Sequence, residues 1–187
     1  MKILKTKFKG LLVINSMKFI DSRGFFRELL QEKLIKKRFI FNVVSVSKKN
    51  VIRGMHLQRK KSQGKFISVI KGSILDVVID LRKNSKTFGK HYKIILNDKN
   101  CKSVYVPEGF AHGFLGLSKE NIVVYSCTNY RNKESETGLI WNDKNLKITW
   151  PIKKPILSSK DRNNITLKNF INLVIYYITI LWVLSII

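Results

Sequence analysis

Three histidines occur in the 187-residue chain, and two of them lie in segments suited to proton transfer. His56 lies in RGMHLQ (53–58), just after an arginine and a turn-permitting glycine, and His112 lies in PEGFAHGF (107–114). Histidine is the side chain whose ordinary pKa allows it to accept a proton near neutral pH. A lone histidine more often fills a half-buried polar niche, so the residues alone leave both interpretations open.

Carboxylates are scarce, because Asp and Glu number 12 against 36 Lys and Arg. They lie in short, distinctive stretches such as DSRGFFRE (21–28), WND (141–143) and LSSKD (157–161), with Asp76 and Asp80 in an apolar run. Ordinary surface acids would be spread more evenly over a lysine-rich chain. This clustering therefore hints that individual acids have specific roles.

Short β-type segments punctuated by turn residues must position these side chains. The pattern predicts strands at Lys65–Ile70, Ser73–Leu81, Tyr92–Leu96, Ser103–Val106 and Asn121–Thr128. Helical spacing of leucine and isoleucine predicts one short helix near Arg27–Lys37. Many short strands with little helix are typical of a β-sandwich or barrel.

The first two of these strands form a predicted hairpin around Gly72. In the run 73–81, side chains alternate between the two faces of the strand. Leu75, Val77, Ile79 and Leu81 share one face, and Asp76 and Asp80 lie on the other with Ile74 and Val78. Asp76 is therefore expected on a largely apolar face.

The formal net charge of +24 would suit a protein that binds nucleic acid or an anionic membrane. The lysines are scattered singly and in pairs, however, and the chain is also rich in isoleucine and asparagine, as an A/T-rich coding sequence produces. We therefore interpret the charge as a solvated surface and expect no nucleic-acid partner. Cys101 and Cys127 have no metal-ligand spacing, which favours a reduced, cytoplasmic protein.

Nine segments together closely resemble the dTDP-4-dehydrorhamnose 3,5-epimerase family of nucleotide-sugar enzymes. They follow one another in register over roughly residues 1 to 165. Each alone is a weak signal, whereas nine in order are specific. The segments are DSRGFFRE (21–28), RGMHLQ (53–58), QGKFISVIKG (63–72), DVVIDLRKNSKTFG (76–89), PEGFAHGF (107–114), YSCTNY (125–130), GLIWND (138–143), ITWP (148–151) and LSSKD (157–161).

The resemblance implies an all-β fold, a double-stranded β-helix (cupin-like jelly roll) with short peripheral helices, working as a homodimer without cofactor or metal. The implied substrate is a nucleotide-diphosphate 4-keto-6-deoxyhexose, used in deoxysugar and cell-surface polysaccharide biosynthesis. Protons at C3 and C5, acidified by the C4 ketone, would be removed and returned to the opposite face. Such chemistry needs a base, a charge that stabilises the enolate oxygen, and an acid on the far face.

The resemblance also implies the role of each site residue. His56 would be the base, Asp161 would orient it, Tyr125 would be the acid, and Lys65 would stabilise the enolate with His112 nearby. The substrate-binding residues would be Arg23, Glu28, Arg53, Lys65, His112, Glu136 and Lys160, the two arginines matching phosphate oxygens.

Two departures from the family pattern stand out. The family usually carries a Gln and an Asn, two residues apart, that help to hold the nucleotide base, and this chain has Phe41 and Val43 there. The identity of the base therefore stays open. Epimerisation at C3 alone, or of a different 4-keto sugar, also stays open, because the orientation of the Tyr125 ring does not follow from the sequence. The second departure is the C-terminal segment, residues 169–187, which follows the expected 1–168 catalytic domain.

The segment Phe170–Ile187 has 18 residues without a charge. As a helix it would span about 27 Å, close to the hydrocarbon thickness of a bilayer. We expect a membrane helix that would associate the cytoplasmic domain with the membrane. Packing onto its own domain, a place at a dimer interface, and a sequence accident are the alternatives.

Two functions of other classes compete with the epimerase. A metal-dependent cupin enzyme is favoured by PEGFAH, which fits half of a metal-cupin pattern, but His56 and Gln58 have no nearby Glu to complete the other half. A non-catalytic cupin that only binds nucleotide sugars, or a polyanion-binding jelly roll, is the third hypothesis. The presence of His56, Lys65, Tyr125 and Asp161 together argues against a purely binding role.

Overall fold

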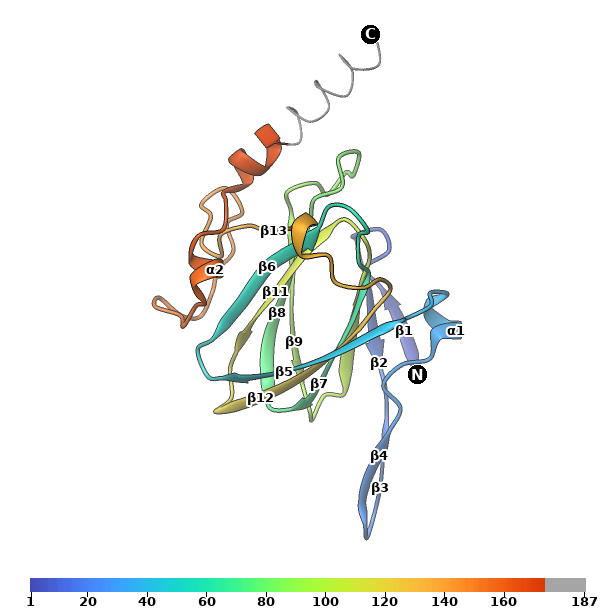
Figure 1. Cartoon of the computed structure of the whole chain (residues 1–187). Coiled ribbons are helices and arrows are strands. Elements are labelled where there is room, and N and C mark those ends of the chain that lie inside the picture. The colour runs from blue at the N-terminus through green and yellow to red at the C-terminus, as the bar shows by residue number, and fades with distance from the viewer. Residues whose placement is uncertain (174–187) are drawn as a thin grey trace.

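A computed structural model of the chain describes residues 1–173, and its architecture is almost entirely β (Figure 1). Two antiparallel sheets carry most of the strands. One sheet has the order β1-β2-β10-β7-β12-β5 and the other has the order β13-β6-β11-β8-β9. The labelled helices are single turns at the periphery, α1 (Glu32–Ile35) and α2 (Ser159–Arg162), with a 3-10 turn at Lys133–Ser135. Residues 167–173, at the end of the described chain, are also helical.

The strands of the six-stranded sheet are β1 (Lys2–Lys5), β2 (Leu12–Asn15), β5 (Phe41–Lys48), β7 (Lys65–Lys71), β10 (Lys102–Val106) and β12 (Glu120–Cys127). Those of the five-stranded sheet are β6 (Ile52–Gln58), β8 (Ser73–Asp80), β9 (His91–Asn97), β11 (Phe110–Gly116) and β13 (Glu136–Gly138). The five strands predicted from the sequence are thereby confirmed to within two residues at each end.

The predicted hairpin of β7 and β8 is wrong, because β7 pairs with β10 and β12 in the six-stranded sheet, whereas β8 pairs with β9 and β11 in the five-stranded sheet. The turn at Gly72 therefore carries the chain from one sheet to the other. The predicted alternation of faces along β8 is confirmed. Ile74 and Val78 of β8 pack in the core between the sheets, with Phe8, Leu11, Ile67 and Val123. Val77 and Ile79 pack on the other side, in a second core cluster with Met55, Leu139 and Leu146. Both faces of β8 are therefore buried, which explains why its sequence is nearly continuously apolar.

The helix predicted over Arg27–Lys37 is wrong in its extent. Arg27 ends strand β4 (Gly24–Arg27), and only the turn Glu32–Ile35 is helical. The guanidinium of Arg27 explains the difference, because it donates to Ser16 Oγ at 2.8 Å and to Ser103 Oγ at 3.3 Å. These tertiary contacts hold the segment against the six-stranded sheet in an extended form, overriding its helical spacing.

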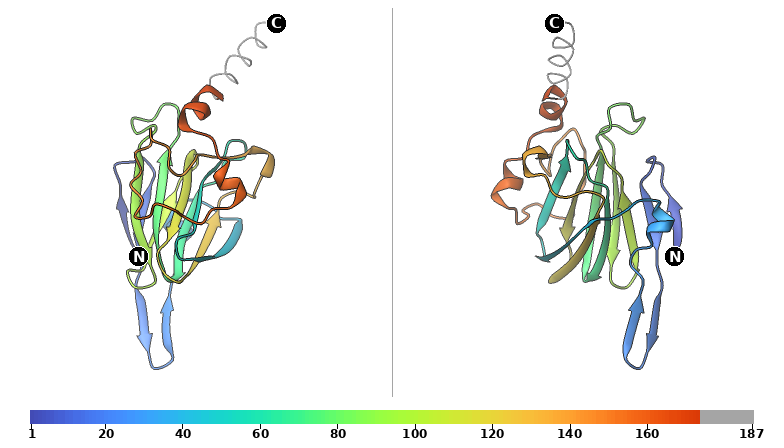
Figure 2. Two further views of the ribbon diagram at one scale, coloured as in Figure 1. Left: turned by 90° about the vertical axis from the view of Figure 1, so that its left-hand side faces the viewer. Right: turned by 45° about the vertical axis from the view of Figure 1, so that its right-hand side comes forward.

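Strands β3 (Lys18–Asp21) and β4 form a separate hairpin that projects well beyond the two sheets (Figures 1 and 2). Its large apolar side chains are exposed, with Ile20 at 80% and Phe26 at 65% of full accessibility. Contiguous exposed apolar residues of this size usually mark an interaction surface.

Within residues 1–173, no helix is long and apolar enough to cross a membrane. Most of the membrane helix expected over Phe170–Ile187 falls outside the described residues, and the division into 1–168 and 169–187 stays a prediction. Phe170 itself is only 4% exposed and packs in the second core cluster with Leu167. Its aromatic ring belongs to the packing of the described chain.

Candidate active site

One cavity of about 330 Å³ collects most of the side chains that the sequence singled out. Eight of the ten predicted site residues line it: Arg53, His56, Lys65, His112, Tyr125, Glu136, Lys160 and Asp161. They come from strands β6, β7, β11 and β12, from the start of β13, and from α2. The two sheets and the C-terminal segment thus contribute to one site.

His56 and Asp161 form a hydrogen-bonded pair in this cavity. Nε2 of the imidazole lies 2.5 Å from Oδ1 of the carboxylate, which is almost fully buried. Burial by itself would raise the pKa of Asp161, but the hydrogen bond and charge of His56 lower it below its ordinary value. Ser158 caps α2 by accepting the backbone N–H of Asp161 at 3.1 Å, and this fixes the carboxylate in position.

His112 forms a second, more deeply buried pair with Asp76. His112 Nε2 and Asp76 Oδ2 are 2.7 Å apart, and the two side chains are 5% and 1% exposed. His112 on β11 is the register partner of His56 on β6 and of Val78 on β8. Because directly paired residues project from the same face of a sheet, the pairing brings the two imidazoles to the same cavity.

Lys65 and Tyr125 enter the cavity from the opposite sheet. On the paired strands β7 and β12, Lys65 faces Cys127 and Tyr125 faces Ile67. Burial lowers the pKa of the Lys65 ammonium, while burial raises the pKa of the Tyr125 phenol far above its ordinary value. Tyr125 therefore keeps its proton throughout the neutral range. Its ring packs edge-on against the His112 ring, with the two ring centroids 6.0 Å apart.

Cations surround the carboxylate of Glu136. Its Oε2 accepts hydrogen bonds from Lys160 Nζ at 2.6 Å and from Arg131 at 2.8 Å. Burial alone would raise the pKa of Glu136, but these two donors lower it to about 2. Arg53 donates to Ser47 Oγ at 2.8 Å and to the Val46 carbonyl oxygen at 3.2 Å. A cavity with this excess of positive charge suits an anionic ligand.

Arg23 and Glu28 do not reach this cavity. Arg23 lies at the tip of the projecting hairpin, pairs with Asp21 at 2.7 Å, and has a side chain 88% exposed. Glu28 follows the same hairpin and accepts a hydrogen bond from Gln31 at 2.7 Å. Within one chain, therefore, the structure does not bring these two predicted binding residues to the others.

Several lining residues were not predicted from the sequence. Arg131 directly follows the YSCTNY segment, Gln63 opens the QGKF segment, and Ser158 precedes Asp161, so their positions beside the motifs could have indicated them. Asp76 was expected on an apolar strand face, but its pairing with His112 depends on the register of β8 and β11. That register could not be derived from either segment alone.

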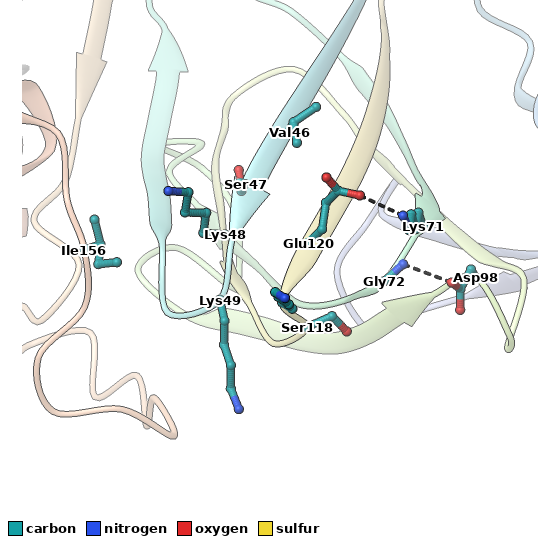
Figure 3. Close-up of a pocket in the computed structure, with 11 residues that line it drawn as sticks. Val46, Ser47, Lys48, Lys49, Lys71, Gly72, Asp98, Ser118, Glu120 and Ile156 are labelled. Atoms are coloured by element: carbon teal, nitrogen blue, oxygen red, sulfur yellow. Dashed lines mark hydrogen bonds and ion pairs between the residues drawn. The ribbon is translucent and has the colours of Figure 1, made fainter.

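A larger and more open cavity of about 1040 Å³ lies elsewhere, at the turns that join β5 to β6, β7 to β8, β9 to β10 and β11 to β12 (Figure 3). Its charged side chains include Lys48, Lys49 and Lys71, and Lys71 is paired with Glu120 at 2.8 Å. Asp98 accepts the backbone N–H of Gly72 at 2.9 Å. No histidine or tyrosine lines this cavity, so the proton-transfer groups identify the smaller cavity as the candidate active site.

In the described part of the chain, no group of three or more His, Cys, Asp or Glu side chains is arranged to hold a metal ion. Around His56, the neighbouring carboxylate is that of Asp161, and around His112 it is that of Asp76. Each histidine is thus paired with its own acid.

Comparison with known proteins identifies the family. Residues 5–169 match the family model of dTDP-4-dehydrorhamnose 3,5-epimerase. The dTDP-4-dehydrorhamnose 3,5-epimerase of Methanothermobacter thermautotrophicus is 42% identical over 170 residues, which cover 87% of this chain and 92% of that protein.

Two solved structures have the same architecture. The Legionella pneumophila dTDP-6-deoxy-D-glucose-3,5-epimerase, in complex with dTDP-4-keto-L-rhamnose, superposes with a TM-score of 0.85 at 38% identity, covering 89% of this chain and 93% of that one. A 3'-monoepimerase from Streptomyces bikiniensis, in complex with dTDP-quinovose, superposes with a TM-score of 0.85 at 27% identity, covering 90% and 89%. The family model spans every residue that lines the cavity described above, and the chain belongs to the dTDP-4-dehydrorhamnose 3,5-epimerase family of isomerases.

Proposed function

We propose that this chain epimerises a dTDP-linked 4-keto-6-deoxyhexose at C3 and C5, through an enolate. The observation that carries the proposal is the His56–Asp161 pair, which opens onto the same cavity as Lys65, His112 and Tyr125. A base, a cation and a proton donor around one cavity are the groups that this reaction requires.

The first step is removal of the proton on the carbon next to the ketone. Because Nε2 of His56 faces the Asp161 carboxylate, that nitrogen carries the hydrogen, and Nδ1 is left as the base that accepts the substrate proton. The electron pair of the broken C–H bond moves to the C4 oxygen, and the imidazole becomes an imidazolium. Asp161, a positioning residue, stabilises that charge and keeps the ring in the required tautomer.

The enolate oxygen then needs a fixed positive charge. Lys65 is the cation that supplies it, with His112 held beside it by Asp76 at 2.7 Å. Because His112 is buried and Lys65 is half-buried, their interaction with a developing charge is less screened than it would be in water. Tyr125 donates its phenolic proton to the opposite face of the carbon, which inverts the configuration.

We propose a homodimer of jelly-roll domains of the cupin type as the working form. The two sheets that enclose the cavity are the basis for the jelly-roll assignment. On the outer face of β5, Val44 and Val46 are 62% and 55% exposed, and the β3–β4 hairpin exposes further apolar side chains. A second copy that covered these surfaces could receive the hairpin tip, which would carry Arg23 to the partner's cavity.

Arg23, Glu28, Arg53, Glu136 and Lys160 are the proposed substrate-binding residues. Arg53 and Lys160 would bind the diphosphate from within the chain, and Glu136 would hold Lys160 in place through their 2.6 Å contact. Arg23 would bind the diphosphate from the partner, since its guanidinium is unable to reach the cavity of its own chain.

Isotope exchange in heavy water tests the proposal. Incubated with a dTDP-4-keto-6-deoxyhexose, the protein should incorporate deuterium at C3 and C5, and His56→Ala should abolish exchange at both carbons. Exchange at C3 alone would reduce the function to 3-epimerisation. No exchange at either carbon would contradict the proposal and favour a non-catalytic binding protein. Stoichiometric metal in the purified protein, together with loss of activity on adding a chelator, would favour the metal-dependent cupin enzyme.

A further inference from the structure

The mouth of the active-site cavity carries an aromatic pair that the catalytic steps leave unused. The rings of Phe41, at the start of β5, and Tyr130, in the loop after β12, lie 5.8 Å apart and are tilted by 53°. Phe41 lines the cavity, and Tyr130 is 62% exposed. A large exposed aromatic surface beside a polar cavity is suited to stack against a flat ligand group.

The loop that carries Tyr130 is tied down on both sides. The buried amide of Gln58 donates to the Tyr130 carbonyl oxygen at 3.2 Å and accepts the backbone N–H of Asn132 at 2.9 Å. Gln63 donates to the Asn129 carbonyl oxygen at 2.7 Å. The backbone that presents the ring is therefore fixed in the absence of ligand, which reduces the ordering cost when a ligand stacks on it.

The neighbouring side chain on the same strand face is also apolar. Val43, two residues after Phe41, lines the cavity and is 37% exposed. Neither a phenylalanine nor a valine side chain can donate or accept a hydrogen bond. Strand β5 therefore offers an apolar surface at the mouth, and the side chains at 41 and 43 cannot distinguish one pattern of hydrogen-bonding groups from another.

Cations lie further along the same cavity. Arg53, Arg131 and Lys160 line it together with His56 and Phe41, so a diphosphate bound by these groups would share the cavity with a sugar at His56. In a nucleoside diphosphate sugar, the diphosphate separates the sugar from the nucleoside. With the sugar at His56 and the diphosphate at the cations, the nucleobase falls at the aromatic mouth.

We infer that Phe41, Val43 and Tyr130 form a base-stacking platform that accepts different nucleobases with similar affinity. This inference rests on the proposed function and adds how strongly the site selects among nucleobases. Stacking is tolerant of base identity because every base has a π-face. An apolar surface also discriminates only weakly against polar groups on the edge of the base. The substrate class is therefore a nucleoside diphosphate 4-keto sugar, with the base selected loosely.

Calorimetric titration of the full chain with dTDP, UDP, CDP and GDP tests this inference. The four dissociation constants should agree within about tenfold, because stacking does not read the base edge. A preference for dTDP of about 100-fold or more would overturn the platform and leave the epimerase proposal standing. If none of the four bound, the proposed nucleotide-sugar function would fail as well.

A matched set of variants separates stacking from folding. Phe41→Leu keeps an apolar side chain and removes the aromatic face, so it should lower the affinity for each of the four nucleotides at least about fivefold. Phe41→Tyr keeps the ring and should restore the affinity. Inorganic pyrophosphate reports on the cations alone, and its affinity should be equal in all three proteins. Equal loss of nucleotide and pyrophosphate affinity in Phe41→Leu, or loss of neither, would contradict the platform.

Discussion

Asp161 and His56 are 105 positions apart in the chain, and their side chains meet at 2.5 Å. His56 lies within strand β6, whereas Asp161 lies in the single turn α2 near the C-terminal end of the described chain. The pair joins the β-sheet framework to the segment that follows it. The proposed base therefore depends on correct docking of residues remote from the strands that carry it.

Replacing Asp161 with Asn should lower kcat by about 100- to 10,000-fold with little change in KM. The amide keeps the shape of the side chain but cannot stabilise the imidazolium or enforce one tautomer. Steady-state kinetics measure kcat and KM separately, and a near-normal kcat, or a loss confined to KM, would contradict the positioning role.

Replacing Tyr125 with Phe should separate proton removal from proton return. Burial raises the pKa of the Tyr125 phenol, so the wild-type residue holds a proton that it can donate at neutral pH. Without the hydroxyl, turnover should fall by about 100-fold or more, while His56 still exchanges the C3 proton with solvent. Deuterium incorporation followed by NMR, beside product formation, distinguishes the two. Normal turnover in this variant would exclude Tyr125 as the acid.

Mixing two inactive variants tests whether Arg23 acts across a dimer. In a hybrid of His56→Ala and Arg23→Ala chains, one site receives both changes and the other receives neither. Equal mixing after subunit exchange makes about half of the dimers hybrid, so about one quarter of wild-type activity should return. If Arg23 served its own chain's site, every site in the mixture would be damaged and no activity would appear.

Asp80 should make the stability of the fold depend on acidic pH. Burial alone would raise its pKa, but hydrogen bonds from Arg82, Ser85 and Thr87 lower it to about 2, from an ordinary 3.8. A depressed carboxylate pKa contributes stability that is present above pH 4 and is lost as the pH falls through 2. The contribution at neutral pH is about 2 kcal/mol.

Urea denaturation of Asp80→Asn measures this contribution. The variant should be less stable than the wild type by about 2 kcal/mol at pH 7. The difference should narrow as the pH is lowered toward 2, because the wild-type carboxylate is then protonated too. A difference that stayed constant between pH 7 and pH 2.5 would mean that the charge of Asp80 is not its source.

Local sequence determined the strands and the identities of the reactive side chains. The turn residues around Gly72 and the alternation in 73–81 predicted the strands β7 and β8 and the two faces of β8, because these features depend on near neighbours. The predicted pairing of β7 with β8 was wrong, because the choice of partner strand depends on distant segments. Spacing predicted a helix over 27–37 that is only the turn Glu32–Ile35, since the contacts of Arg27 with Ser16 and Ser103 are made across the fold. Intrinsic helical spacing is a weak preference beside such contacts.

Tertiary structure decided how the site is assembled. The register of β6, β8 and β11 places His56 beside His112 and brings His112 within hydrogen-bond distance of Asp76. A shift of one residue in this register would turn these side chains to the other face of the sheet. The hairpin carries Arg23 away from its own cavity, although the sequence grouped Arg23 with the binding residues. Sequence motifs specify which groups are available, whereas strand register and the direction of a hairpin depend on pairing energies summed over distant segments.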